Sequence, residues 1–159
     1  MSDPRADLVE PPFTVFNFEV RLDLGGAGGL AGPLCSAAFS ECDGLEMTME
    51  PKTLREGGNN REQVHLPGPV SYGQVTLKRG MTATRDLWRW FALVTRDGAG
   101  RGARAQGEIV VKSGDGRPQY TVVLKDCLPV KLKAPALNAR EGLIAVEELT
   151  LVCASLSVE

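Results

Sequence analysis

The residues best suited to nucleophilic or metal chemistry in this sequence are one histidine and four cysteines. They are His65, Cys35, Cys42, Cys127 and Cys153. No two cysteines form a Cys-x-x-Cys pair, so the ligand spacing of a structural metal site is absent. His65 lies in a polar stretch without a nucleophile-elbow motif, and the acidic residues show no spacing that suggests acid–base catalysis. We therefore predict no catalytic residue, no metal and no cofactor, and we expect that the chain is not an enzyme.

The cysteines are better explained as packing residues. Cys153 lies within an apolar, strand-like run and Cys127 just follows another, so both are predicted to be small buried thiols. Cys35 and Cys42 could approach each other across a loop, but a structural disulfide is disfavoured in a reducing cytoplasm.

Composition limits the classes of protein that remain. The chain has 159 residues, of which 43% are hydrophobic and 24% charged, as in an ordinary soluble domain. Its net charge of −2 argues against a dedicated nucleic-acid or anionic-membrane binder. No apolar run approaches the ~20 residues of a membrane span, and the N-terminus lacks the hydrophobic region of a signal peptide. We expect a chain that stays in the cytoplasm.

Two stretches are predicted to lie outside the folded core. Residues 1–12 are polar and end in two prolines, which predicts a flexible N-terminal arm. Residues 24–38 are rich in glycine, but they lack the strand–GxGxxG–helix context of a dinucleotide-binding loop. We interpret this second stretch as a surface insertion.

The central region holds two predicted strands and a long polar connection. Residues 45–50 and 75–78 alternate apolar and polar side chains, as residues 16–23 do nearer the N-terminus. Each pattern predicts a strand with one buried face. Between the last two strands, Pro51–Pro69 contains little that could fill a core. A connection of that length is usually functional or disordered.

One helix is predicted, starting near Thr84. Asp86 would lie in its first turn, and apolar residues recur at helical spacing from Leu87 to Val94, which predicts one buried stripe. Trp88 lies off that stripe, so its indole is a candidate contact for a partner.

The C-terminal third is predicted to be β-structure. A turn at residues 114–116 joins two strands as a hairpin. The last strand, 143–156, is apolar on both faces and is interrupted by Glu147 and Glu148. One of these carboxylates must point inward, and it needs a cationic partner that could belong to a neighbouring chain. The fold class that follows is mainly β with one helix: a small antiparallel β-sandwich or barrel, formed by residues 13–159 and flanked by the helix.

The order of these segments resembles a known family. The runs are FSECDGLEMTMEPKTLREGGNN (39–60), LPGPVSYGQVTLKRG (66–80), DLWRWF (86–91), LPVKLKAPALNA (128–139) and VEELTLVCASL (146–156). Together they resemble the tail tube proteins of contractile phages, a family that also supplies the inner tubes of extracellular contractile injection systems. The resemblance covers residues 13–156.

The resemblance implies a structural subunit with a fold like that of haemolysin-coregulated protein. Six copies would form a ring, and stacked rings would form a tube whose partners are hub, sheath and baseplate proteins, with cargo in its lumen. The glycine-rich insertion and the N-terminal run PPFTVFNFEV depart from the usual pattern, which favours a tube-initiating ring over the repeated tube subunit. A monomeric β-barrel that carries a small ligand or effector is the alternative outside this class.

The resemblance also indicates which surfaces would be used. Pro51–Pro69 would be an arm that lies on the adjacent ring, and the last strand would be buried between its own core and a neighbour. The candidate inter-subunit and ring-stacking residues are Arg55, Glu56, Gly57, Gly58, Asn59, Asn60, Arg61, Leu137, Asn138, Glu147 and Glu148. The candidate outer-surface residues, facing sheath or baseplate, are Arg85, Trp88 and Arg89. The particle, a virion or an injection system, would assemble in the cytoplasm.

Overall fold

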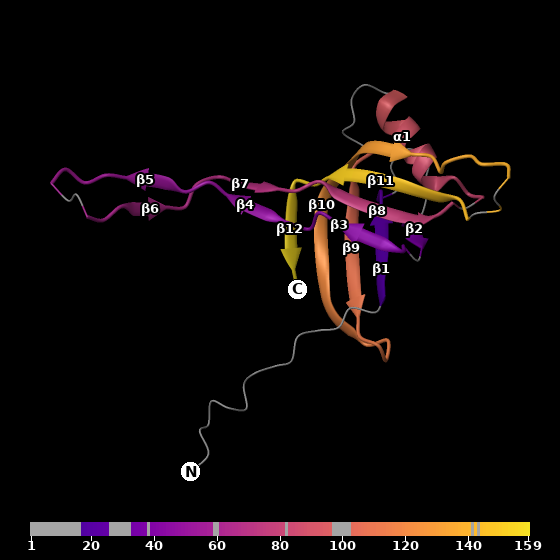
Figure 1. The fold of residues 1–159 in the computed structure, drawn as a ribbon, viewed down its shortest axis with the longest axis horizontal. Helices are drawn as coiled ribbons and strands as arrows, with labels where there is room; N and C mark the ends of the chain where they lie inside the picture. Colours follow the sequence, from indigo (N-terminus) through magenta and orange to yellow (C-terminus); the bar gives the residue numbers. More distant parts are fainter. Residues whose placement is uncertain are drawn as a thin grey trace, which may run out of the picture.

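The computed structural model describes residues 17–25, 33–37, 39–58, 61–81, 83–96, 103–140, 142 and 144–159. Within these residues the chain forms twelve strands and one α-helix (Figure 1). The elements are β1 (Asn17–Asp23), β2 (Pro33–Ala37), β3 (Glu41–Asp43), β4 (Met47–Met49), β5 (Lys52–Leu54), β6 (Val64–Leu66), β7 (Val70–Tyr72), β8 (Val75–Gly80), α1 (Asp86–Arg96), β9 (Ala105–Lys112), β10 (Pro118–Lys133), β11 (Val146–Val152) and β12 (Ser155–Val158). The predicted fold class, mainly β with one helix, is confirmed.

One antiparallel sheet forms the body of the molecule. Its strand order is β2-β1-β9-β10-β11-β8-β3, and β12 pairs with β10 beside β11. The longest strand is β10, which has 16 residues and belongs to both halves of this sheet. Its first part pairs with β9 and β12, and its last part pairs with β11. Asp126, at φ 53°, marks the change of partner.

The core follows the alternation of the sequence. Val20 and Leu22 of β1 are fully buried, as predicted, and so are Leu149 and Leu151 of β11. The helix packs against β2 and β10 and buries Leu87 and Trp90 completely, while Phe91 and Val94 of the predicted stripe are half-buried. The indole N–H of Trp90 donates to the carbonyl oxygen of Ala103 at 2.6 Å, so this buried ring keeps its polar atom satisfied.

A long two-stranded ribbon projects from this body (Figure 1). β4 pairs with β7 next to the sheet, and β5 pairs with β6 further out. The predicted strand over residues 45–50 is therefore present in part, but its predicted buried face is wrong, because Met47 is 57% and Met49 47% exposed. Both sections of the ribbon are two-stranded, and β4, β5 and β6 are exposed along their whole length.

Other differences concern turns and ends. The glycine-rich stretch contains β2, which pairs antiparallel with β1, so part of the predicted insertion belongs to the sheet. The predicted last strand is divided into β11 and β12 by a break at Cys153 and Ala154. The hairpin turn at 114–116 is confirmed: Gly116 adopts φ +83° and its N–H donates to the carbonyl of Ser113. The predicted N-terminal arm, residues 1–12, lies outside the described residues, as do Asn59 and Asn60.

Candidate functional site

The ribbon formed by β4–β7 and β5–β6 is the first candidate assembly surface. It contains the predicted inter-subunit connection, Pro51–Pro69, and the whole ribbon is called the arm from here on. Each of its two faces is open to solvent, and the burial pattern of β4, β5 and β6 is exposed throughout. Apolar side chains that are 44–57% exposed lie along it: Met47, Met49, Leu54, Val64, Leu66 and Val70. Apolar residues grouped on an exposed surface mark sites of interaction with other proteins.

Charged and glycine residues form the tip of the arm. Arg55, Glu56 and Arg61 are described and exposed. Gly57 has open space where a side chain would lie, and Gly58 has the same space but adopts φ +102°. The structure therefore brings five of the predicted inter-subunit residues, Arg55–Gly58 and Arg61, together at one projecting turn.

Three glycines let the two strands of the arm approach closely. A Cβ at Gly44 would lie 1.9 Å from the carbonyl oxygen of Gln74, and Gly44 itself adopts φ +85°. A Cβ at Gly68 would lie 1.7 Å from the carbonyl oxygen of Glu50. A Cβ at Gly73 would lie 2.4 Å from the side chain of Glu46. The direction of the arm therefore depends on positions that accept no side chain.

The segment between β10 and β11 is the second candidate surface, and it lies at the opposite end of the molecule from the arm (Figure 1). Leu137 is 94% and Ile144 83% exposed. Asn138 accepts the backbone N–H of Arg140 through its side-chain oxygen at 3.0 Å, which stabilises the turn at this point. Two large apolar side chains are thus held in water on a turn that has its own hydrogen bond.

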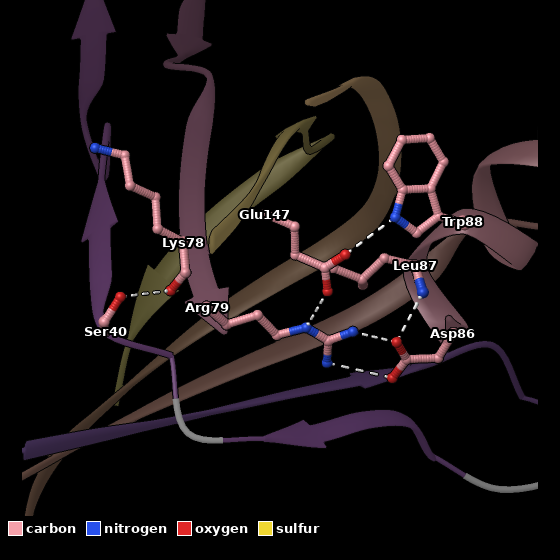
Figure 2. Close-up of polar contacts among 7 residues, drawn as sticks. All are labelled: Ser40, Lys78, Arg79, Asp86, Leu87, Trp88 and Glu147. Atoms are coloured by element: carbon pink, nitrogen blue, oxygen red, sulfur yellow. Dashed lines mark hydrogen bonds and ion pairs between the residues drawn. The ribbon is translucent and has the colours of Figure 1, made fainter. Parts of the chain in front are cut away.

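The cationic partner of Glu147 comes from its own chain, and not from a neighbouring chain. It points inward from β11 and is 1% exposed. Its cationic partner is Arg79 of the same chain, which faces it in the β8–β11 ladder and donates from Nε to Glu147 Oε1 at 2.7 Å. Figure 2 shows Glu147 also accepting the indole N–H of Trp88 at 3.0 Å. Intrachain contacts therefore satisfy this carboxylate.

Asp86 completes this buried cluster from the start of the helix. Both terminal nitrogens of the Arg79 guanidinium donate to its carboxylate (Figure 2), and Asp86 Oδ1 accepts the backbone N–H of Leu87 at 2.9 Å. The ring of Phe39 lies 5.4 Å from the guanidinium carbon, within the range of a cation–π contact. One buried cation thus connects β8, β11 and the helix.

The remaining predicted residues lie on the surface near this cluster. Glu148 is half-buried and faces Lys78 across the ladder, while Lys78 Nζ pairs with Glu41 at 3.0 Å. Arg85 and Arg89 are exposed, and the Arg85 carbonyl accepts the N–H of Arg89 at 3.0 Å, so the helical hydrogen bonds begin one residue after Thr84. The indole N–H of Trp88 is directed inward, which leaves its half-buried ring as the outer-surface candidate.

A second polar group lies on the outer face of β1 and β9. Glu19 accepts from Arg21 Nε at 3.0 Å and from Lys112 Nζ at 2.9 Å. These hydrogen bonds, first from Arg21 and then from Lys112, lower the pKa of Glu19. The group is about 29% exposed, so solvent screens much of this attraction.

The described residues offer little for covalent or metal chemistry. They contain no group of three or more His, Cys, Asp or Glu side chains that could hold a metal ion. Burial raises the pKa of Cys42 to about 11 and that of Cys127 to about 12, which keeps both thiols protonated near neutral pH. His65 is exposed on β6. Among the helices of the described part, none has the length and apolarity needed to cross a membrane.

Arg79 is the structurally important residue that the sequence reasoning missed. The strand predicted over residues 75–78 stops one residue before it. The alternation of β8 contains the signal, because Val75, Leu77 and Arg79 share one face and all three are buried. A buried arginine predicts a buried carboxylate, and Glu147 was the candidate.

Comparison with known proteins gives consistent results. Residues 14–157 match the profile of the family described as T4-like virus tail tube protein gp19. A solved structure of the anti-feeding prophage (AFP) baseplate contains a similar chain, with a TM-score of 0.76, 24% identity and coverage of 95% of this chain and 97% of that one. The PVC sheath–tube complex of an extracellular contractile injection system, in its extended state, contains another, with a TM-score of 0.73, 20% identity and coverage of 100% and 99%.

A more distant likeness extends to an Hcp1 protein. Hcp1 from Flavobacterium johnsoniae matches with a TM-score of 0.52 and 12% identity, covering 90% of this chain and 94% of that one. These structural likenesses concern the fold. A search of curated proteins found no significant match.

Proposed function

Because this chain belongs to the T4-like virus tail tube protein family, we propose that it is a structural subunit of the inner tube of a contractile injection system or phage-like tail. Six copies form a ring, and rings stack through the arm. The solved relatives named above come from a baseplate and from a sheath–tube complex, which supports placement in the same kind of particle. Assembly in the cytoplasm, with sheath and baseplate proteins as partners, is part of this proposal.

The observation that carries the proposal is the exposed arm. Its apolar side chains from Met47 to Val70 are 44–57% exposed, and a two-stranded ribbon is at best marginally stable alone in water. A neighbouring subunit that covers the arm would bury these side chains and supply the missing packing. The hydrophobic effect, roughly 25 cal/mol per Å² of apolar surface, favours that contact.

The positions of the two candidate surfaces support a head-to-tail contact. The arm projects from one end of the sheet, and the turn with Leu137 and Ile144 lies at the other (Figure 1). A contact between different surfaces of identical subunits closes into a ring when the rotation allows, and otherwise extends. A closed ring is the product that the proposed subunit needs, and the exposed arm is then the surface proposed to stack one ring on the next.

The place of the ring within the tube is the finer part of the proposal. We propose the tube-initiating ring beside the baseplate hub, on the basis of the glycine-rich run and N-terminal run described above. Copy number decides between this ring and the repeated tube. Counting subunits per purified particle should give one or two rings for an initiator and dozens for a repeated tube subunit.

Deletion of Gly57–Asn60 tests the role of the arm. The deletion shortens the tip without touching the core, so the variant should keep the circular dichroism spectrum and urea midpoint of the native chain. It should form no stacked rings in negative-stain images. Gly57→Ala is the matched control, because this position has open space around it, and it should assemble normally. Stacked rings formed by the deletion variant, or a native chain that stays monomeric at high concentration, would contradict the proposal.

A further inference from the structure

The register of the two ladders that flank them places Cys127 of β10 opposite Cys153, in the break between β11 and β12. The β10–β12 ladder pairs Lys125 with Ser155, and the β10–β11 ladder pairs Leu128 with Val152. Moving two residues along β10 from Lys125 reaches Cys127, and moving two residues back from Ser155 reaches Cys153. Moving one residue from the pair Leu128 and Val152 reaches the same two cysteines. Both ladders therefore share one register, and the two cysteines occupy the short gap between them.

The two thiols also lie on the same side of the sheet. Leu149 and Leu151 of β11 point into the core, and Cys153 continues their alternation. Cys127 is fully buried in that core, and Cys153 packs against it. Both cysteines are free in this structure.

We propose that Cys127 and Cys153 are a redox-active pair that forms a cross-strand disulfide when the folded chain meets a small disulfide oxidant such as oxidised glutathione. Facing residues of an antiparallel pair have Cα atoms about 4.5–5.5 Å apart. That separation lies within the roughly 4.4–6.8 Å that a disulfide spans. This inference concerns the isolated subunit and does not depend on ring assembly.

The reaction balances as two successive thiol–disulfide exchanges. The thiolate of Cys153, which is the more exposed of the two, attacks one sulfur of oxidised glutathione and releases one glutathione thiolate, which takes up a proton. The thiolate of Cys127 then attacks Sγ of Cys153 and displaces the second glutathione. Two protein thiols are oxidised, and one glutathione disulfide is reduced to two thiols.

The environment of the pair determines the rate of this reaction. Desolvation raises the pKa of Cys127 to about 12 and also raises that of Cys153. The reactive thiolates are therefore scarce at neutral pH, and the rate should rise as pH is raised from 7 to 9. The bond should be slow to form in a reducing medium and persistent once the chain has left it.

Peptide mapping tests the pairing directly. The native folded protein is incubated with oxidised glutathione at pH 8.5, remaining thiols are blocked with N-ethylmaleimide, and the chain is digested with trypsin without reduction. The expected product joins DCLPVK (126–131) to EGLIAVEELTLVCASLSVE (141–159). Cys35 and Cys42 lie together on one other tryptic peptide, 22–52, so a wrong pairing has a different mass.

Stability and variants provide an independent readout. Oxidation should raise the urea midpoint by about 1–2 M, because the bond closes a loop of more than twenty residues. Cys153→Ser should abolish both the linked peptide and this shift, and Cys42→Ser, a matched control, should keep both. The proposal is overturned if the linked peptide is absent after prolonged oxidation, or if it appears only when denaturant is added before the oxidant.

Discussion

Replacing Arg79 with methionine removes the one cation of the buried cluster while keeping much of its side-chain volume. The Arg79 side chain is 2% exposed, that of Glu147 2% and that of Asp86 19%. In the variant, Glu147 keeps the hydrogen bond from the Trp88 indole, but this buried carboxylate is left without its cation. Breaking a buried ion pair in this way costs about 3–5 kcal/mol of unfolding free energy.

The adjacent residue offers a matched control. Lys78→Met removes a salt bridge to Glu41 at 3.0 Å whose side chains are 34% and 57% exposed, and such surface pairs contribute about 0–1 kcal/mol. Urea unfolding of the unassembled protein, followed by circular dichroism, should show a midpoint about 1.5–2 M lower for Arg79→Met and almost unchanged for Lys78→Met. Equal losses in the two variants would refute the assignment of Glu147 to an intrachain partner.

Three further predictions concern the arm, the outer face of β1 and the helix. Gly44→Ala should lower the unfolding free energy by about 2 kcal/mol or more, since φ is +85° and the new Cβ meets a carbonyl oxygen at 1.9 Å; it should also reduce ring stacking, whereas Gly57→Ala should do neither. Glu19 has a pKa lowered below 4.5 in the folded state, so its contribution is present above that pH and lost as pH falls through the lowered value; Glu19→Gln should flatten the acid limb of the stability curve by less than about 1 kcal/mol. Trp90→Phe should cost about 2 kcal/mol by urea unfolding, because it opens space in the core and leaves the carbonyl of Ala103 without its donor; a cost below about 0.5 kcal/mol would contradict this assignment.

Local patterns predicted the parts of the fold that depend on neighbours in sequence. The alternation of Val20 and Leu22 correctly indicated a strand with one buried face, and the spacing of Leu87 and Trp90 correctly indicated the buried side of the helix. Gly116 marked the hairpin turn. The signal in each case is local: apolar residues every second position for the strand, apolar residues at a spacing of about 3.6 for the helix, and a glycine for the turn.

The same patterns failed where burial depends on what lies opposite. Met47 and Met49 alternate with polar residues as core strands do, yet they lie on a two-stranded ribbon and are exposed. Whether a face is buried depends on tertiary packing, which alternation does not encode. Glu147 illustrates the same limit: the need for a cation was predictable, but its source in β8 depends on which strand lies beside β11.

The open ribbon has a consequence for the chain before it assembles. Among the described residues no third strand pairs with either two-stranded section, and open strand edges promote adhesion between chains. A freshly synthesised molecule therefore carries its greatest aggregation hazard on the segment that we propose as its joint. The soluble yield of recombinant protein should therefore depend on how quickly copies assemble correctly. Shortening the ribbon should make the monomer more soluble but unable to assemble.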